Sequence, residues 1–268
     1  MERKVVLVTG ASSGIGKAIG LLLAEKGYTV YGTSRKAIAH QDFTYFQMVQ
    51  LDVHHQESIT AAITKIIAQE GRLDVLVNNA GVGITGPIEE TPIEEIQKAF
   101  DTNFYGAVRT IKAVLPQMRK QNAGLVINIT SIAGYMGLPY RGIYSASKSA
   151  LLVMTEALRM EIKDFGIHVT NLAPGDIATN IAAGRYHAPV LKNSPYAAYE
   201  RSLKMMDEHV DGAMDASIVA KKVLRIIQKK NPKVHYEVGD FMQKFSLFLK
   251  RILPDKVYEK LLLNHYKL

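Results

Sequence analysis

Two side chains capable of acid–base chemistry lie one helical turn apart in the segment YSASKSA, residues 144–150. Tyr144 carries a phenol, and Lys148 places an amine on the same face of the expected helix. A free phenol has a pKa of roughly 10, too high for efficient proton exchange near neutral pH. A neighbouring ammonium group stabilises the phenolate, and lowering the phenol pKa by about three units corresponds to roughly 4 kcal/mol. The spacing indicates an acid–base pair.

A glycine-containing turn lies near the start of the chain, in VLVTGASSGIG. Gly10, Gly14 and Gly16 have a G-x-x-x-G-x-G spacing between an apolar strand and a helix. Glycine permits a tight turn and close approach of a ligand, and the free N–H groups and dipole of the helix start attract phosphate. The turn therefore predicts binding of a pyrophosphate-containing nucleotide.

The same turn contains a competing pattern, because Gly10 to Gly14 also reads as G-x-S-x-G, the nucleophile elbow of serine hydrolases. In this alternative Ser12 is the nucleophile, assisted by a downstream acid and a histidine. An elbow on the first strand leaves no preceding strand–helix loop to supply the second oxyanion donor, so we favour the nucleotide site.

Further motifs follow in order along the chain: NNAG at 78–81, a lone Ser131 after a strand, YSASK at 144–148 and PGDIAT at 174–179. With TGASSGIG, this ordered set resembles the short-chain dehydrogenase/reductase family over about residues 4–238. The resemblance implies an enzyme that transfers hydride between a nicotinamide cofactor and a carbonyl or alcohol. A nucleotide sensor on the same fold is the nonenzymatic alternative, although a sensor would not need a tyrosine donor.

The resemblance implies catalytic roles for four residues. Tyr144 is the general acid–base, and Lys148 tunes it and binds the nicotinamide ribose. Ser131 polarises the substrate carbonyl, and losing such a donor should cost roughly 3 kcal/mol of transition-state stabilisation. Asn103, within DTNFYGA, helps to hold a water for a proton relay. Taken alone, Ser131 could be a helix cap and Asn103 an ordinary helix residue.

The resemblance also implies a continuous cofactor groove. Asp52 and Val53 contact the adenine, residues 79–81 lie near the ribose, and residues 174–179 surround the nicotinamide. Asn78 is expected to tie strands together. The predicted cofactor-binding residues are Gly10, Ser12, Ser13, Gly14, Ile15, Gly16, Ser34, Arg35, Asp52, Val53, Asn79, Ala80, Gly81, Tyr144, Lys148, Pro174, Gly175, Ile177 and Thr179.

The end of the second strand, YGTSRK, bears on the choice between NAD and NADP. A carboxylate there would bind the ribose hydroxyls of NAD and repel the extra phosphate of NADP. Ser34 stands at that position, and Arg35 can pair with a phosphate in forked geometry. We therefore predict NADP(H), although Ser13 stands where some NADP-dependent relatives carry a basic residue.

Short runs of Val, Ile and Leu alternate with longer segments of helical period, which is typical of a doubly wound parallel α/β sheet. We expect one Rossmann-like domain over residues 1–268. The expected strands are Lys4–Thr9, Thr29–Thr33, Thr44–Gln50, Val75–Asn78, Leu125–Thr130, His168–Ala173 and Val234–Val238.

Several helix ends are readable from the sequence. Gly27 should take the left-handed position after a helix, and Asp215 should cap a helix start. TPIEE predicts a helix with Thr91 as N-cap and Pro92 in its first turn. The expected helices are Ile15–Lys26, residues 91 to about 118, residues 144 to about 163, and Ala216–Lys229.

Two regions depart from the regular alternation. Residues 180–214 are expected to be loop-rich and to form either a substrate lid or a surface excursion with its own small core. Residues 239–268 are expected to form a basic amphipathic helical extension that packs at a subunit interface, covers the pocket or lies on a membrane. We favour packing because Pro254 interrupts the helical pattern.

Composition narrows the classes of partner. The chain has no cysteine, which excludes disulfides and thiolate metal sites, and its histidines lack ligand spacing, so no metal is expected. The net charge of +8 is scattered rather than clustered, which disfavours nucleic acid and suits an anionic cofactor. An apolar strand pattern begins almost at residue 1, so we expect a cytoplasmic protein rather than a secreted one.

The substrate and the assembly state are less defined by the sequence. Tyr135, Met136, Pro139 and Tyr140 lie close to Ser131 in sequence, and the candidate lid carries aromatic and methionine side chains, among them Met205 and Met206. Together they suggest a lipophilic ligand. The chain is similar to the steroid- and retinoid-active branch of the family, and a ketoacyl substrate remains an alternative. The resemblance also implies a homodimer or homotetramer.

Overall fold

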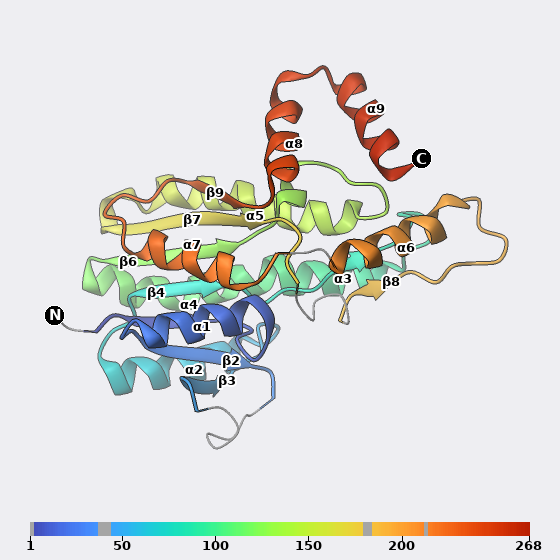
Figure 1. Cartoon of the computed structure of the whole chain (residues 1–268). Helices are drawn as coiled ribbons and strands as arrows, with labels where there is room; N and C mark the ends of the chain where they lie inside the picture. Colours follow the sequence, from blue (N-terminus) through green and yellow to red (C-terminus); the bar gives the residue numbers. More distant parts are fainter. Residues whose placement is uncertain (1–2, 37–43, 179–183, 212–213) are drawn as a thin grey trace.

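A seven-stranded parallel sheet forms the centre of the computed structural model, which describes residues 3–36, 44–178, 184–211 and 214–268. The strands lie in the order β3-β2-β1-β4-β6-β7-β9, so the chain starts near the middle and winds to both edges (Figure 1). The strands are β1 (Val5–Val8), β2 (Thr29–Ser34), β3 (Gln47–Gln50), β4 (Val75–Asn78), β6 (Gly124–Ile129), β7 (Ile167–Pro174) and β9 (His235–Val238). The predicted doubly wound fold is confirmed, with β3 beginning later than Thr44.

Helices cover both faces of the sheet because its strands are apolar on both sides. Along β1 the side chains alternate: Val6 and Val8 belong to one core, and Val5 and Leu7 belong to the other. The first core is covered by α1 (Gly14–Glu25) and α7 (Ser217–Ile227). The second core is covered by α2 (Gln56–Glu70), α4 (Gly106–Gln121) and α5 (Gly142–Glu161).

The helix ends test the capping predictions. Gly27 follows α1 with φ of 83°, in the left-handed region as expected, and Asp215 Oδ1 accepts the Ser217 N–H at 2.8 Å before α7. The prediction for Thr91 is wrong, because its hydroxyl donates to the Pro87 carbonyl at 2.7 Å. Pro92 takes the N-cap position instead of the first turn, and α3 (Ile93–Phe100) begins after it.

The long helix expected from residue 91 towards residue 118 is divided. A π-helical turn, η2 (Asp101–Tyr105), lies between α3 and α4. Such turns occur often at functional sites, because the extra residue re-aims the side chains around it. Asn103 lies within this turn and is buried.

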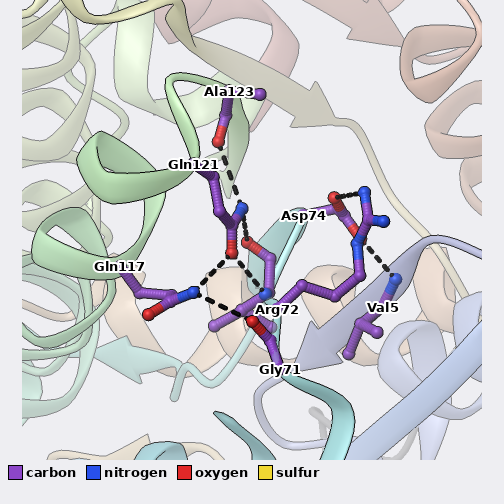
Figure 2. A network of polar contacts seen from close by, with 8 residues as sticks. Val5, Gly71, Arg72, Asp74, Gln117, Gln121 and Ala123 are labelled. Carbon is purple, nitrogen blue, oxygen red and sulfur yellow. Dashed lines mark hydrogen bonds and ion pairs between the residues drawn. The ribbon is translucent and has the colours of Figure 1, made fainter.

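A polar network at the amino-terminal edge of the sheet joins the loops before β4 and β6 (Figure 2). The buried Asp74 carboxylate accepts the Val5 N–H at 2.7 Å and pairs with Arg72 at 2.7 Å. Gln121, at the end of α4, donates to the Leu73 carbonyl and accepts the Leu73 N–H. The network stabilises the sheet at the edge opposite to the carboxyl ends of its strands.

The prediction of a loop-rich region holds for residues 188–197, which form neither helix nor strand, and is wrong for residues 198–211. Residues 180–183 and 212–213 lie outside the described residues. β8 (Tyr186–His187) pairs in parallel with β5 (Ile84–Thr85), and α6 (Ala198–Asp211) follows. Tyr199 anchors α6, because its buried hydroxyl lies 3.2 Å from the Thr85 carbonyl oxygen. Tyr199 therefore holds α6 against β5.

The C-terminal residues form two helices, α8 (Phe241–Ile252) and α9 (Asp255–Tyr266), separated at Pro254 as the sequence predicts. A capping box between Asp240 and Gln243 starts α8. In Figure 1 the two helices stand as a hairpin beyond the β7–β9 half of the sheet. Among the described helices, none has the length and apolar content needed to cross a bilayer.

The hairpin also packs on the body of the protein. The buried residues Leu247 and Tyr258 contact Met136 and Ile132 from the short 3-10 helix region η3 (Ile132–Tyr135) that follows β6. The C-terminal extension thus packs on the segment that directly follows Ser131.

Candidate active site

A cavity of about 720 Å³ lies at the carboxyl ends of the strands, where open parallel sheets bind ligands. Of the predicted site residues, its wall contains Gly10, Ser12, Ser13, Gly14, Ile15, Ser34, Arg35, Val53, Asn79, Ala80, Gly81, Ser131, Tyr144, Lys148, Pro174, Gly175 and Ile177. Gly16, Asp52 and Asn103 do not line the cavity, and Thr179 lies outside the described residues. The fold therefore brings together residues that are up to 167 positions apart in sequence, from Gly10 to Ile177.

The turn after β1 has the geometry that the glycine spacing predicts. Gly10 and Gly14 have φ of 64° and 53°, in the left-handed region that favours glycine. A Cβ on Gly16 would collide with the Gly10 carbonyl oxygen, so only glycine lets the helix start approach the turn. The first helix-type bond is from Lys17 N–H to Ser13, which leaves the N–H groups of residues 14–16 without intrahelical partners.

Asn79 and Thr9 hold this turn in place. The Asn79 side-chain amide donates to the Thr9 and Gly10 carbonyls at 2.9 and 3.1 Å. The Thr9 hydroxyl accepts the N–H groups of Asn79 and Ala80. The amide of Asn79 is therefore committed to bracing the turn.

Three asparagines link adjacent strands beneath the cavity. Asn78, Asn128 and Asn171 are register neighbours on β4, β6 and β7. The Asn78 amide donates to the Asn128 side-chain oxygen at 2.9 Å, and Asn128 donates to the Thr155 hydroxyl of α5 at 2.8 Å. The expectation that Asn78 ties strands together is confirmed, and the link to Thr155 also fixes α5 against the sheet.

The Asp52 side chain does not line the cavity and instead interacts with its neighbour His54. Its carboxylate lies 2.7 Å from His54 Nδ1 and accepts the His54 backbone N–H at 3.0 Å. Burial alone would raise the pKa of Asp52, but these hydrogen bonds and the charge of His54 outweigh it and hold the pKa below its usual value. His54 itself lines the cavity and was not identified from the sequence.

Tyr144 and Lys148 lie on α5, and Ser131 follows β6 on the same side of the cavity. The Lys148 ammonium is buried, lies 6.0 Å from the centre of the Tyr144 ring and donates to the Ile129 carbonyl at 3.1 Å. The Ser131 hydroxyl accepts the Ala133 N–H at 3.1 Å and also hydrogen-bonds Tyr144. The predicted triad therefore converges on one part of the wall.

The sequence predicts a lowered pKa for Tyr144, whereas in the structure its pKa is raised. Burial raises its pKa, while the charge of Arg141, the Ser131 hydrogen bond and the charge of Arg185 act in the opposite direction. The net direction is upward, so the protein's own groups keep the phenol protonated at neutral pH. Burial also lowers the pKa of Lys148 to about 8, because a low-dielectric environment disfavours the charged amine.

Asn103 takes its place from the π-helical turn η2. Its side chain accepts the Val82 N–H at 2.8 Å and donates to the Val82 carbonyl at 3.0 Å and to Ser147 at 3.1 Å. A Cβ on Gly81 would lie 3.1 Å from Asn103 Oδ1 and 3.3 Å from Lys148 Nζ, so these two atoms border the same glycine. Asn103 and Lys148 thus lie close together, and the role of Asn103 in a proton relay stays a prediction.

The segment after β7 joins the cavity to the C-terminal hairpin. Gln243 of α8 donates to Asp176 at 2.9 Å, and a Cβ on Gly175 would collide with the Gln243 side chain. Glycine at position 175 therefore lets α8 pack closely against the cavity wall. No local pattern in the sequence predicts this contact.

The cavity wall contains residues that sequence reasoning missed. Arg141 precedes Tyr144 by one helical turn, a spacing that could have identified it, whereas Arg185 and Tyr266 come from distant segments. Met205 and Met206, which the sequence placed in the candidate lid, also line the cavity. The Tyr266 hydroxyl hydrogen-bonds Arg141, which brings α9 to the edge of the site.

Conversely, residues expected near the substrate lie elsewhere. Tyr135, Met136, Pro139 and Tyr140 do not line the cavity. Met136 packs against Tyr258 of α9, and Tyr140 packs against Tyr199. The sequence argument for a lipophilic ligand from these four residues is therefore wrong. Ser12 has an exposed side chain in the glycine turn and lines the cavity.

Comparison with known proteins agrees with this geometry. The family model described as short chain dehydrogenase matches residues 4–189. The chain is 40% identical to 3-ketodihydrosphingosine reductase of Bacteroides thetaiotaomicron over 261 residues, which cover 97% of this chain and 96% of the relative.

Solved structures share the fold of this chain. A short-chain dehydrogenase from Streptomyces avermitilis superposes with a TM-score of 0.84 at 31% identity, covering 100% of this chain and 97% of the other. The structure of ElxO with NADP bound superposes with a TM-score of 0.74 at 28% identity, covering 89% and 98%. From the matched family model, the full-length relative and the glycine turn with its tyrosine and lysine, the chain belongs to the short-chain dehydrogenase/reductase family of oxidoreductases.

Proposed function

We propose that this chain is an NADP(H)-dependent oxidoreductase that transfers hydride between the cofactor and a carbonyl or alcohol substrate. The observation that carries the proposal is the cavity itself: the glycine turn lies at one end, and Tyr144, Ser131 and Lys148 lie at the other. A dinucleotide with its phosphates at the turn would extend towards these three side chains.

The residues present fit such a cofactor. The N–H groups at the start of α1 suit a pyrophosphate, and the glycines leave space that a Cβ would fill. The nicotinamide supplies or accepts the hydride when bound. Lys148, whose Nζ would lie 3.3 Å from a Cβ on Gly81, would bind the ribose hydroxyls.

Tyr144 and Ser131 divide the chemistry at the substrate oxygen. Reduction leaves negative charge on this oxygen, and Tyr144 transfers its phenolic proton to it. Ser131 donates a hydrogen bond that polarises the carbonyl beforehand. The raised pKa of Tyr144 keeps the proton available, and the positive charges of Arg141 and Arg185 stabilise the phenolate that remains. Asn103 donates to Ser147 and borders the same glycine as Lys148, which supports a role of Asn103 in the proton relay.

The preference for NADP(H) rests on the end of β2. Ser34 and Arg35 line the cavity, and a serine does not repel the extra phosphate as a carboxylate would. Arg35→Ala should raise the KM for NADPH by roughly 10-fold or more, because a charge-assisted hydrogen bond is lost, and leave the KM for NADH unchanged. Lys26→Ala is the matched control, since Lys26 is an exposed cation at the opposite end of α1. Equal effects on both cofactors would contradict the preference.

The catalytic assignment is tested with Tyr144→Phe. Loss of the proton donor should lower kcat by roughly 100-fold to 10,000-fold across a panel of ketones, while NADPH binding stays close to wild type. Tyr105→Phe is the matched control, because its ring is half exposed and outside the cavity. Turnover by Tyr144→Phe at the wild-type rate would refute the assignment, and NADPH binding without turnover by the wild type would favour a sensor.

We further propose a lipophilic substrate, of steroid, retinoid or ketoacyl type. Met205 and Met206 of α6 contribute flexible apolar side chains to the cavity wall. The similar protein from Bacteroides thetaiotaomicron is, by its name, a reductase of 3-ketodihydrosphingosine. A panel read by NADPH oxidation should show turnover of ketones with long apolar groups, and turnover of small polar sugars alone would contradict the proposal.

A further inference from the structure

One face of α8 carries large apolar side chains in solvent. Phe241, Phe245, Phe248 and Ile252 follow each other at helical spacing, so they lie on one stripe of the helix. Phe241 is 75% exposed, Phe248 is 54% exposed and Ile252 is 57% exposed. An exposed apolar stripe of this kind marks a contact with a protein or a membrane.

The stripe is ordered by the chain's own contacts. The rings of Phe241 and Phe245 stack at 5.7 Å with 9° between their planes, and Phe245 stacks on Phe248 at 6.1 Å. The other side of α8 is held by Leu247, which is buried against the body of the protein. The helix therefore presents its aromatic face outward while its orientation is fixed from behind.

Positive charge surrounds the stripe. Residues 241–268 contain six lysines and arginines and two acidic residues, so the hairpin is distinctly basic. Lys244 and Arg251 lie beside the stripe on α8, and both are exposed. The cations of the hairpin are Lys244, Lys250, Arg251, Lys256, Lys260 and Lys267.

This charge decides between a bilayer and a second copy of the chain. A twofold contact through the stripe would bring the same cations face to face, which is unfavourable. An anionic bilayer instead accepts aromatic side chains at its interface and attracts the flanking lysines and arginines.

The same hairpin reaches the cavity. Tyr266 of α9 lines the cavity together with Tyr144, and Gln243 of α8 hydrogen-bonds Asp176 in the cavity wall. The hairpin that carries the apolar stripe therefore also contributes to the edge of the proposed active site.

We propose that the α8–α9 hairpin docks this protein on the surface of anionic lipid bilayers through the stripe Phe241, Phe245, Phe248 and Ile252. The helices lie on the membrane without crossing it, and they orient the cavity edge near Tyr266 towards the lipid surface. Docking does not depend on the proposed redox activity, so the two are tested separately.

The test is flotation of the full-length protein with vesicles of phosphatidylcholine alone or of phosphatidylcholine mixed with phosphatidylglycerol. Wild type should float with the anionic vesicles at low salt and much less with neutral vesicles. Phe241→Glu/Phe248→Glu should lower this partitioning roughly 100-fold. Lys244→Glu/Arg251→Glu should lower it about 10-fold or more while leaving the aromatic stripe intact. Ile93→Glu is the matched control, because Ile93 is equally exposed but lies on α3, and it should float like wild type.

The results that overturn the proposal are specific. Wild type that stays with neither kind of vesicle refutes docking, as does a Phe241→Glu/Phe248→Glu variant that floats like wild type. If wild type does not float and this variant instead changes from an oligomer to a monomer in sedimentation, the stripe joins copies of the chain. Circular dichroism of each variant shows whether it is folded, which separates loss of docking from loss of folding. The Lys244→Glu/Arg251→Glu variant is the second probe, because both of its positions are exposed.

Discussion

Replacing Lys148 by methionine should stabilise the folded protein at neutral pH while removing its activity. Lys148 is buried, and its pKa falls from 10.5 to about 8, so folding disfavours the charged amine by about 3.4 kcal/mol relative to the neutral amine. Methionine has a similar length and no charge. Losing the hydrogen bond to the Ile129 carbonyl offsets about 1.5–3 kcal/mol of the gain, which leaves a net stabilisation of roughly 1 kcal/mol.

The pH dependence of this difference is the sharper observable. The folded state releases the Lys148 proton near pH 8, whereas the unfolded chain holds it to about pH 10.5. The unfolded state therefore binds more protons in this window, and wild-type stability rises with pH there. With these two pKa values, wild type gains about 2 kcal/mol between pH 7 and pH 9.5 that Lys148→Met lacks.

The assay is urea unfolding of both proteins at pH 7 and pH 9.5, followed by circular dichroism at one protein concentration. Other groups titrate in both proteins, so their contributions cancel in the difference. Lys148→Met should be the more stable protein at pH 7 and should lose this advantage by pH 9.5. A difference between the two proteins that stays constant with pH would refute the reasoning that Lys148 is desolvated.

The remaining predictions concern the turn, the opposite edge and the relay. Gly16→Ala should weaken NADPH binding about 10-fold or more in a fluorescence titration, because its Cβ collides with the Gly10 carbonyl oxygen. Asp74→Ala should lower the free energy of unfolding by roughly 3–5 kcal/mol with kcat unchanged, since it breaks the network at the edge opposite the cavity. Asn103→Ala should lower kcat about 10-fold, because the Val82 backbone loses both of its partners; an unchanged kcat would contradict this.

The sequence alone determined the strands and the turn, because their signals are local. A run such as VVLV needs only its own apolar side chains to indicate a strand buried on both faces. Glycines with positive φ can be recognised where the chain must turn sharply, and Tyr144 and Lys148 are related by the period of one helix. Their order along the chain then carried the resemblance to a family.

Tertiary structure decided what depends on contacts between distant segments. Burial raises the pKa of Tyr144, and the charges of Arg141 and Arg185 lower it. Neither effect can be predicted from the segment YSASK. Tyr266 reaches the cavity because Leu247 and Tyr258 anchor the C-terminal hairpin against Met136, a residue that sequence proximity had placed near the substrate. Spacing along the chain reports which side chains share one helix or one turn. Desolvation and long-range charge depend on what the whole fold packs around a group, and only the three-dimensional arrangement specifies that environment.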